Sequence, residues 1–358
     1  MTTIAAVRGA LPDHAHSQDE ITAVFGDVVL GKALHRRPLL ERVHASAGVT
    51  RRHLALPLES YAELGGFGAS NDVFIDVGVC LAERAIRDAL DAAGLGAGDV
   101  DLIMSTSVTG VAAPSLDARL VPRLGLRPDV RRLPIFGLGC VAGAAGIARL
   151  HDILRGQPDA VAVLVAVELC SLTLQRDDTS TANLVASGLF GDGAAAVVLV
   201  GEHRARRMGL PAGGLAPRVV DTRSRFYPDT ERVMGWDIGE SGFRIVLAPT
   251  VADVVEKYLG DDVESFLAGH GLAIGDIDTW VAHPGGPKVI DAIVRALDLP
   301  ADALDVTRRS LAAVGNLSSA SVLHVLQDTL AGRPTPGTPG LLLALGPGFC
   351  AELVLLEW

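Results

Sequence analysis

The sequence predicts an α/β protein built from two similar halves, and three observations indicate this fold class. The first is composition, since 49% of the 358 residues are hydrophobic and only 4% are aromatic. Small aliphatic side chains therefore form the core, as in proteins that pack helices closely on a sheet. The second is that apolar runs of strand length alternate with segments of helical spacing. The third is an internal repeat.

The repeat consists of two copies of one motif at a long period. Residues 94–101 read Gly-Leu-Gly-Ala-Gly-Asp-Val-Asp, and residues 271–278 read Gly-Leu-Ala-Ile-Gly-Asp-Ile-Asp. A long-period repeat of this kind indicates duplicated halves rather than a solenoid. We expect two domains, 1–210 and 211–358, divided within the polar stretch 202–217. Each half is expected to hold a five-stranded mixed sheet, and the halves are expected to pack about a pseudo-twofold axis.

The expected elements follow from hydrophobic spacing and from turn residues. Cys80 belongs to the apolar stripe of the longest helix, so we place it in the core. Strands are expected at 4–7, 100–104, 133–136, 161–167, 194–200, 279–282 and 351–356. Helices are expected at 18–25, 38–47, 71–93, 114–124 and 141–154.

A glycine-rich turn and a single cysteine precede the helix at 141–154. Gly137 and Gly139 lead directly to Cys140, and alanine and glycine fill most of the next eight positions. Small residues all round a helix predict that it is buried. At the helix start, unpaired N–H groups and the positive dipole end would lower the pKa of the Cys140 thiol. We therefore interpret Cys140 as a nucleophile rather than as a packing residue.

The second half places two further polar residues at equivalent positions. Asn316 follows Gly315 just as Cys140 follows Gly139, and His283 ends the strand at 279–282 before Pro-Gly-Gly. Taken singly, the histidine could be a core residue and the asparagine a helix cap. Together, the three side chains fit a thiolate nucleophile with two donors directed at a carbonyl oxygen.

Several classes of function are disfavoured by composition. A net charge of −11 argues against a nucleic-acid partner. The longest apolar runs are too short to span a membrane, and the first residues do not resemble a signal peptide. The four cysteines have neither metal-ligand spacing nor a disulfide pattern. We expect a cytoplasmic protein without a metal site.

Five motifs together resemble the type III polyketide synthases, specifically bacterial, chalcone-synthase-like members of the thiolase superfamily. The motifs are Gly139-Cys140-x-Ala-Gly143, Gly188-Leu-Phe190-Gly-Asp-Gly193, His283-Pro-Gly-Gly-Pro287, Gly315-Asn316-x-Ser-Ser319 and Gly346-Pro-Gly348. The resemblance extends over essentially the whole chain. It implies a thiolase-like fold, with two duplicated αβαβα halves in a five-layer arrangement, and a homodimer.

The resemblance also implies roles for individual residues. Cys140 would accept the acyl group, and His283 and Asn316 would act as the decarboxylation and oxyanion pair. Phe190 and Phe243 would be the two aromatics between a CoA tunnel and the cavity. The remaining expected substrate-binding residues are Arg51 and Arg52, placed at the CoA phosphates, and Thr173 and Ala113 in the cavity.

The implied reaction needs no cofactor, because its partners are an acyl-CoA starter and malonyl-CoA. The starter acyl group moves to Cys140, malonyl-CoA loses CO2, and the resulting carbanion attacks the enzyme thioester. Repeated extension and cyclisation would give a pyrone or resorcinol-type product. Small residues such as Ala112 and Cys170 favour an alkyl starter. The loop 108–113 carries no methionine before Pro114, so the plant products do not transfer to this chain.

Two other functions remain open at this point. A β-ketoacyl-acyl-carrier-protein synthase III uses the same three residue types, but usually places Ala-Asn soon after the histidine, where this chain has Pro284-Gly-Gly-Pro287. A non-catalytic scaffold subunit of the same fold would lack the nucleophile, which is present here as Cys140. Thiolase chemistry is disfavoured because Cys350, beside Gly346-Pro-Gly348, lies on a strand entry. The starter, the number of extensions, the ring closure and any substitution on the malonyl extender are left open.

Overall fold

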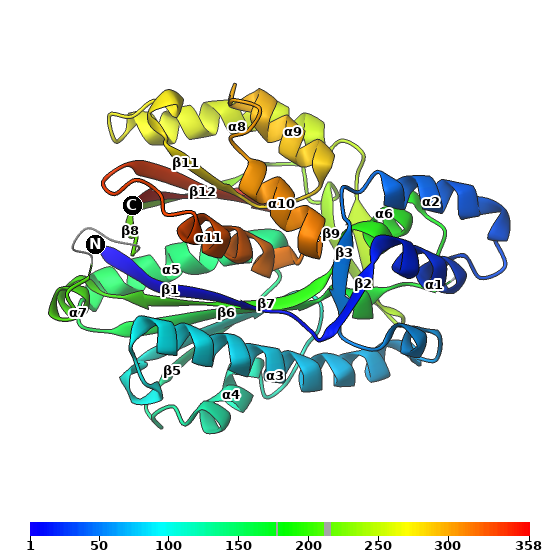
Figure 1. Ribbon diagram of the computed structural model, residues 1–358, viewed down its shortest axis with the longest axis horizontal. Helices are drawn as coiled ribbons and strands as arrows, with labels where there is room; N and C mark the ends of the chain where they lie inside the picture. Colours follow the sequence, from blue (N-terminus) through cyan, green and yellow to red (C-terminus); the bar gives the residue numbers. More distant parts are fainter. Residues whose placement is uncertain (177, 211–215) are drawn as a thin grey trace.

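The computed structural model describes residues 1–176, 178–210 and 216–358. Its elements form five layers, in the order helix, sheet, helix, sheet, helix (Figure 1). In that view α3 and α4 lie at the bottom, α5 and α11 lie in the middle, and α8 and α9 lie at the top, with strands between them. The predicted five-layer α/β fold is confirmed. Within the described ranges, no helix has both the length and the apolar composition needed to cross a membrane.

The elements have the following bounds. The strands are β1 (Thr2–Ala10), β2 (His14–Ser17), β3 (Arg51–Leu54), β4 (Leu102–Ser107), β5 (Arg131–Phe136), β6 (Val161–Leu169), β7 (Asp192–Val200), β8 (Arg218–Phe226), β9 (Met234–Gly239), β10 (Gly242–Leu247), β11 (Thr279–Ala282), β12 (Pro339–Gly346) and β13 (Cys350–Glu357). The α-helices are α1 (Gln18–Leu30), α2 (Arg37–Ala45), α3 (Gly66–Ala93), α4 (Leu116–Leu124), α5 (Ala142–Gly156), α6 (Thr181–Leu189), α7 (Glu202–Arg207), α8 (Val251–Ala268), α9 (Pro287–Ala296), α10 (Asp305–Val314) and α11 (Ser321–Ala331).

Strand pairing follows the same pattern in both halves, as expected for a duplication. In the first half β4 runs parallel to β6, β6 antiparallel to β7, and β7 antiparallel to β1. In the second half β11, β12, β13 and β8 pair in the same order and sense. The two halves meet where β1 pairs with β8 through only two residues of each strand. The sheet order is therefore β11-β12-β13-β8-β1-β7-β6-β4-β5.

The expectation of five strands in each half is wrong for the second half. Five strands come from the first half and four from the second. Where β5 precedes Cys140 in the first half, helix α10 precedes Asn316 in the second. Thr307, Ser310 and Leu311 are buried along α10 at helical spacing, which explains why this segment is a helix. The expected division at 202–217 falls on α7 and partly on 211–215, outside the described residues, and it stays a proposal.

The two central helices bring the halves into close contact. A Cβ atom on Gly143 of α5 would lie 2.4 Å from the backbone oxygen of Ser319, which belongs to the second half. Only glycine permits this approach. The small-residue motif after Cys140 therefore serves the contact between the helix starts of the two halves.

The long helix α3 corrects one residue assignment. Its buried stripe includes Val79, Leu81 and Ala82, whereas Cys80 between them is exposed. The Sγ atom of Cys80 instead accepts a contact of 3.8 Å from Arg123 on α4. The prediction that Cys80 lies in the core is therefore wrong.

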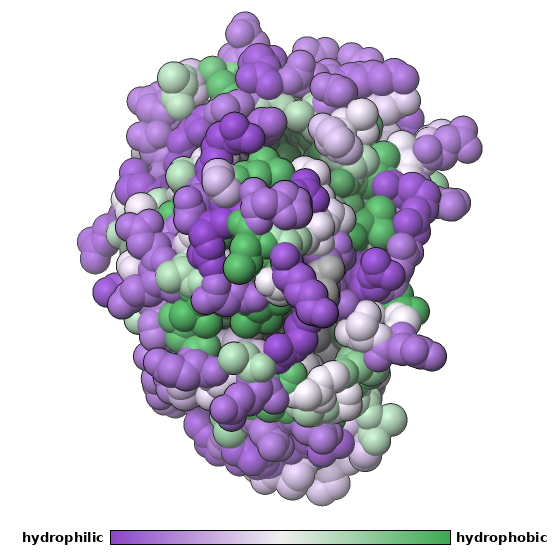
Figure 2. Space-filling view, turned by 90° about the vertical axis from the view of Figure 1, so that its right-hand side faces the viewer, coloured by the Kyte–Doolittle hydropathy of each residue, from purple (hydrophilic) through white to green (hydrophobic). Residues whose placement is uncertain are grey.

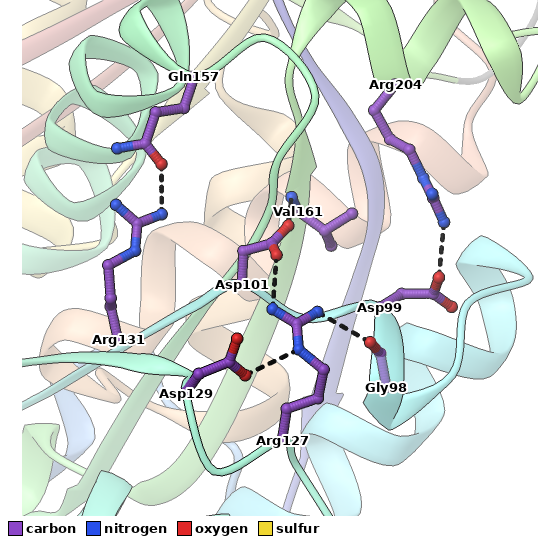
Figure 3. Close-up of polar contacts among 9 residues, drawn as sticks. All are labelled: Gly98, Asp99, Asp101, Arg127, Asp129, Arg131, Gln157, Val161 and Arg204. Atoms are coloured by element: carbon purple, nitrogen blue, oxygen red, sulfur yellow. Dashed lines mark hydrogen bonds and ion pairs between the residues drawn. The ribbon is translucent and has the colours of Figure 1, made fainter.

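The first copy of the repeated motif, which directly precedes β4, is fixed by ion pairs and hydrogen bonds (Figure 3). Arg127 contacts Asp101 at 2.8 Å and Asp129 at 3.0 Å, and Arg204 of α7 contacts Asp99 at 2.7 Å. The other oxygen of Asp101 accepts the Val161 N–H of β6 at 2.8 Å. The motif aspartates thus tie β4 to its neighbouring segments rather than serving a binding site.

Candidate active site

One narrow cavity, of about 40 Å³, is lined by Cys140, His283 and Asn316 together. Each residue follows a helix or strand that fixes its direction. Cys140 lies in the 3-10 turn Gly139–Val141 before α5, His283 directly follows β11, and Asn316 lies between α10 and α11. The rest of the lining is mostly apolar and includes Phe190, Met234, Trp236, Ile245 and Leu343.

The Cys140 thiol is buried, with 8% of the residue exposed. Its Sγ atom donates to the Ser318 hydroxyl at 3.7 Å, across the boundary between the halves. Burial raises the pKa of Cys140 to about 12, and the nearby Glu168 carboxylate adds to this while Ser318 opposes it. The expected lowering of this pKa is therefore wrong, because desolvation outweighs the stabilisation of a thiolate at the helix start.

The His283 residue is buried, with 4% of its surface exposed. Among the described residues, neither Nδ1 nor Nε2 finds a hydrogen bond. Burial lowers the pKa of His283 to about 3, so the ring is neutral. Its backbone N–H donates to the Leu343 carbonyl at 2.9 Å, which continues the parallel pairing of β11 with β12. A neutral, unpaired imidazole can accept a proton on one nitrogen and donate from the other.

The Asn316 side chain is oriented by its own backbone segment. Its Oδ1 atom accepts the Ser318 N–H at 2.8 Å and the Ser321 hydroxyl at 3.3 Å. In the described part of the chain no residue accepts a hydrogen bond from Nδ2, which leaves that amino group as a donor. The preceding Gly315 has φ 75°, and a Cβ there would lie 2.9 Å from the Leu189 carbonyl oxygen. The glycine of the Gly-Asn motif is therefore required for the asparagine to occupy this place.

A buried carboxylate joins the two halves next to this cavity. Glu168, at the end of β6, accepts the Val108 N–H at 3.1 Å and the Thr109 hydroxyl at 2.8 Å. Its other oxygen accepts the hydroxyl of Ser319 from the second half. Burial raises the pKa of Glu168, which its hydrogen bonds oppose. Among the described residues, no group of three or more His, Cys, Asp or Glu side chains could hold a metal ion.

The two expected aromatics lie in different places. Phe190 lines the Cys140 cavity, but Phe243 does not. Phe243 is 2% exposed and lines a neighbouring cavity of about 350 Å³, with Phe67 in edge contact at 5.5 Å. Trp236 lines the Cys140 cavity and packs against Phe243, with the two ring centres 6.2 Å apart. The assignment of Phe243 to the mouth of the cysteine cavity is therefore corrected.

The other expected substrate-binding residues also lie in different environments. Arg51 is exposed, whereas Arg52 is 1% exposed and donates to the Phe190 carbonyl at 2.8 Å. Arg52 is therefore unavailable to CoA phosphates, and that prediction is wrong. Thr173 lines a small side cavity together with Arg52 and Phe190. Ala113 is exposed and lies on none of these three cavities.

Figure 2 faces the end of the molecule that carries β2, β3 and β9 in Figure 1. This surface is hollowed, and hydrophobic residues gather in the hollows between mostly hydrophilic ones. The strands β9 and β10 form a separate two-stranded sheet that contributes Trp236, Ile245 and Phe243 to the cavities.

Three residues of the site escaped the sequence reasoning. Ser318 and Glu168 become neighbours of Cys140 only when the two halves pack, although the Ser-Ser of the Gly-Asn motif was a usable signal. Trp236 borders the Cys140 cavity, the side cavity and an outer groove that also contains Phe136. The sequence around Trp236, Val-Met-Gly-Trp-Asp-Ile-Gly at 233–239, gave no comparable signal.

Comparison with known families is consistent with this geometry along the whole chain. The family model described as "Chalcone and stilbene synthases, N-terminal domain" matches residues 1–203, and the corresponding C-terminal domain matches residues 218–357. A 1,3,6,8-tetrahydroxynaphthalene synthase from Streptomyces peucetius subsp. caesius is 59% identical over 358 residues, covering 100% of this chain and 93% of that protein. A putative chalcone synthase from Bacillus subtilis (strain 168) is 38% identical, covering 100% of this chain and 99% of that protein.

Solved structures agree with these sequence relatives. The crystal structure of 1,3,6,8-tetrahydroxynaphthalene synthase from Streptomyces coelicolor A3(2), described as a bacterial type III polyketide synthase, matches with a TM-score of 0.91 at 32% identity. The match covers 99% of each chain. The two alternative functions, an acyl-carrier-protein-dependent synthase and a non-catalytic scaffold, are not favoured by any of these similarities. This chain belongs to the chalcone and stilbene synthase family and is a type III polyketide synthase, an acyltransferase that uses CoA thioesters.

Proposed function

We propose that Cys140 is the acyl-accepting nucleophile of this polyketide synthase and that His283 activates it. One observation carries the proposal: a cysteine, an unpaired neutral imidazole and an amide donor line the same cavity. The imidazole accepts the thiol proton as the starter thioester enters, and the sulfur forms a new thioester while CoA leaves as the thiol. Because burial disfavours either charge alone, the thiolate and the imidazolium form together and stabilise one another.

The second step uses the same donors on a different substrate. Malonyl-CoA loses CO2, and the electron pair of the broken bond becomes an enolate with its charge on the thioester oxygen. The Nδ2 group of Asn316 and a ring N–H of His283 donate to that oxygen. The enolate carbon then attacks the carbonyl of the Cys140 thioester and displaces the sulfur. The apolar lining strengthens these interactions because it excludes water.

We further propose a polyhydroxylated aromatic product of the tetrahydroxynaphthalene kind. Support comes from the 59% identity, over the full chain, to a protein named for that product. All carbons of such a product can come from two-carbon units, so malonyl-CoA would supply the starter as well as the extender. This proposal takes precedence over the alkyl starter that small cavity residues favoured.

The alkyl starter remains as a second candidate because of one observation. The neighbouring cavity of about 350 Å³ has apolar walls that include Leu64, Phe67, Leu172 and Phe243. An acyl tail of moderate length fits such walls if Trp236 or Phe243 moves aside. Its polar lining, which includes Gln175 and Arg176, argues against a long and fully apolar tail.

We also propose that the enzyme acts as a homodimer in the cytoplasm. Exposed hydrophobic residues support the dimer, since Phe136 is 51% exposed on β5, an edge strand of the large sheet. Val111 in the loop 108–113 is 41% exposed. Unpaired edge strands and exposed apolar side chains are features that protein interfaces cover.

Product analysis tests the proposal directly. The protein is incubated with labelled malonyl-CoA alone, and then with labelled malonyl-CoA plus a panel of acyl-CoAs of increasing length. We expect a polyhydroxylated aromatic from malonyl-CoA alone, with five CO2 released per molecule if the product is tetrahydroxynaphthalene. Products that form only with a fatty acyl-CoA would favour the alkyl candidate. No product in either case, or full activity in a Cys140→Ala variant, would contradict the proposed reaction.

A further inference from the structure

A buried pair of residues, Gln18 and Arg52, is hydrogen-bonded to the segment that carries Phe190. Arg52 lies on β3 of the small sheet of β2 and β3, outside the large sheet, and Gln18 begins α1 directly after β2. Arg52 donates from Nη1 to the Phe190 carbonyl at 2.8 Å and from Nε to Gln18 Oε1 at 3.1 Å. Gln18 donates from Nε2 to the Gly188 carbonyl at 2.7 Å. Two carbonyls at the C-terminal end of α6, those of Gly188 and Phe190, are thus fixed by one hydrogen-bonded pair.

The segment from Leu189 to Gly191 also hydrogen-bonds to the backbone of Asn316. The Asn316 N–H donates to the Leu189 carbonyl at 2.9 Å, and the Gly191 N–H donates to the Asn316 carbonyl at 3.0 Å. The stem of Arg52 lies against the preceding residue, because a Cβ on Gly315 would be only 3.1 Å from Arg52 Cγ. Arg52 therefore contacts both backbone segments that meet between the two halves of the protein, one at Phe190 and the other at Gly315.

A guanidinium with this degree of burial is costly unless its bonds compensate. Arg52 is 1% exposed, and its Nη2 atom has no partner among the described residues. The segment on its C-terminal side is fixed by Asp192, which accepts the Ala55 N–H at 2.6 Å. The chain on both sides of Arg52 is thus fixed by hydrogen bonds. An apolar residue at this position would fill the same volume without leaving an unpaired donor.

We propose that Gln18 and Arg52 are positioning residues that fix the direction of Asn316 through the Phe190–Asn316 bridge. Asn316 Oδ1 is bound by the backbone that follows it, so the direction of Nδ2 depends on where that backbone lies. The bridge sets this place relative to the first half, which contains Cys140. Displacing a group by about 1 Å from a productive arrangement costs on the order of a hundredfold in rate. The inference rests on the proposed role of Asn316 in malonyl-CoA decarboxylation.

The test compares Arg52→Met, Arg52→Lys and Gln18→Met with a matched control, Arg36→Met. Arg36 belongs to the same N-terminal segment and donates to a backbone carbonyl at the other end of α6, that of Thr179, at 2.6 Å. Two steps are measured separately: malonyl-CoA decarboxylation by CO2 release, and acylation of Cys140 by intact mass. Thermal unfolding of each variant reports whether it is folded.

Arg52→Met is expected to lower the kcat of decarboxylation about tenfold to a hundredfold, with KM and Cys140 acylation within about twofold of wild type. Arg52→Lys should recover part of the rate because an ammonium group can still donate to the Phe190 carbonyl. Gln18→Met should show a smaller loss of the same kind, and Arg36→Met should match wild type. If Arg52→Met does not fold, Arg52→Lys and Gln18→Met carry the same comparison.

A double variant decides whether Arg52 acts through Asn316. Arg52→Met combined with Asn316→Ala should decarboxylate no more slowly than Asn316→Ala alone, because the group being positioned is already gone. If the double variant instead loses decarboxylation rate by the product of the two single losses, the inference is overturned. An unchanged kcat in Arg52→Met, or an equal loss in Arg36→Met, would overturn it as well. If Asn316→Ala itself decarboxylates at the wild-type rate, the proposed role of Asn316 fails instead.

Discussion

Phe190 and Asn316 form a parallel backbone bridge that joins the two halves of the protein beside the Cys140 cavity. Phe190 ends α6 of the first half, and Asn316 begins the segment leading to α11 of the second. Because both side chains line the cavity with Cys140, the bridge sets the distance between an aromatic wall and an amide donor. The duplicated architecture thus places the proposed donors of the second half in the same cavity as the proposed nucleophile of the first.

The reactivity of Cys140 should depend on His283. Burial raises the pKa of the thiol to about 12, so without a proton acceptor the thiolate is scarce at neutral pH. In His283→Ala, alkylation of Cys140 by iodoacetamide at pH 7 should slow at least tenfold and should rise steadily with pH beyond 9. The exposed Cys80 serves as an internal reference in the same mass spectra. Equal alkylation rates for Cys140 in the two proteins would contradict the proposed proton transfer.

Substitutions of Asn316 and His283 should affect the two steps of the reaction differently. Asn316→Ala should lose about 10²–10³ in malonyl-CoA decarboxylation, the usual cost of one oxyanion donor. It should still accept a starter acyl group on Cys140, which intact-mass measurement detects. His283→Ala should be impaired in both steps, because the imidazole serves the thiol as well as the enolate. An Asn316→Ala protein that decarboxylates normally but fails to acylate would reverse the assigned roles.

Trp236 should control the length of the product. Its indole separates the Cys140 cavity from the side cavity and from the outer groove. Trp236→Ala is expected to join these spaces and to shift products toward additional extensions, whereas Trp236→Phe should keep most of the wall and the original product. Mass spectrometry of the products from malonyl-CoA alone measures the shift. The same product length in folded Trp236→Ala would exclude this residue as a size limit.

Arg51 is the arginine of the adjacent pair that remains available to a CoA phosphate. Arg51→Ala should raise KM for CoA thioesters severalfold and leave kcat within about twofold, as expected when binding alone is lost. Added salt should narrow the difference from wild type, since exposed charges are screened. The control is Arg131→Ala, at the far end of the sheet (Figure 3), where no effect on KM is expected. A lower kcat with unchanged KM would place Arg51 in the reaction instead of in CoA binding.

The sequence predicted those features that depend on local signals. Glycine before Cys140 and before Asn316 marked both helix starts, and the repeated Gly-Asp motif marked the duplication. These signals are local because a backbone with positive φ demands a particular residue at one position. The alternation of strands and helices indicated the α/β class, and the family resemblance implied the five-layer order.

Features that depend on distant contacts could not be predicted in this way. Arg52 follows Arg51 in a basic stretch and is typical of a surface residue, yet Gln18 and Phe190 bury it. The pKa of Cys140 was expected to fall because the helix start is local, whereas the desolvation that raises it comes from the whole packed site. Helix α10, which precedes Asn316 where β5 precedes Cys140, was not predicted, because its buried face meets elements such as β3 far along the chain.

Buried histidines should make the fold sensitive to acid. Burial lowers the pKa of His44 to about 3, of His283 to about 3 and of His324 to about 4. The unfolded chain binds protons at these rings near pH 6.5, so the unfolded state binds more protons and stability falls as the pH drops from about 6.5 toward 4. Asp192 opposes this trend, because burial raises its pKa to about 6 and the folded state therefore binds that proton first.

Replacing one histidine should flatten the acid response in a measurable way. His44 contacts Thr22 at 2.9 Å and Ser187 at 3.0 Å, and the amide of His44→Gln can keep one of these hydrogen bonds without titrating. Unfolding by urea at several pH values between 7 and 4.5 gives the free energy of unfolding. The variant should lose less stability per pH unit than wild type, by up to about 1.4 kcal/mol per unit, the limit for one proton. The exposed His35→Gln protein should follow the wild-type slope, and an unchanged slope in His44→Gln would mean that His44 is protonated equally in the folded and unfolded states.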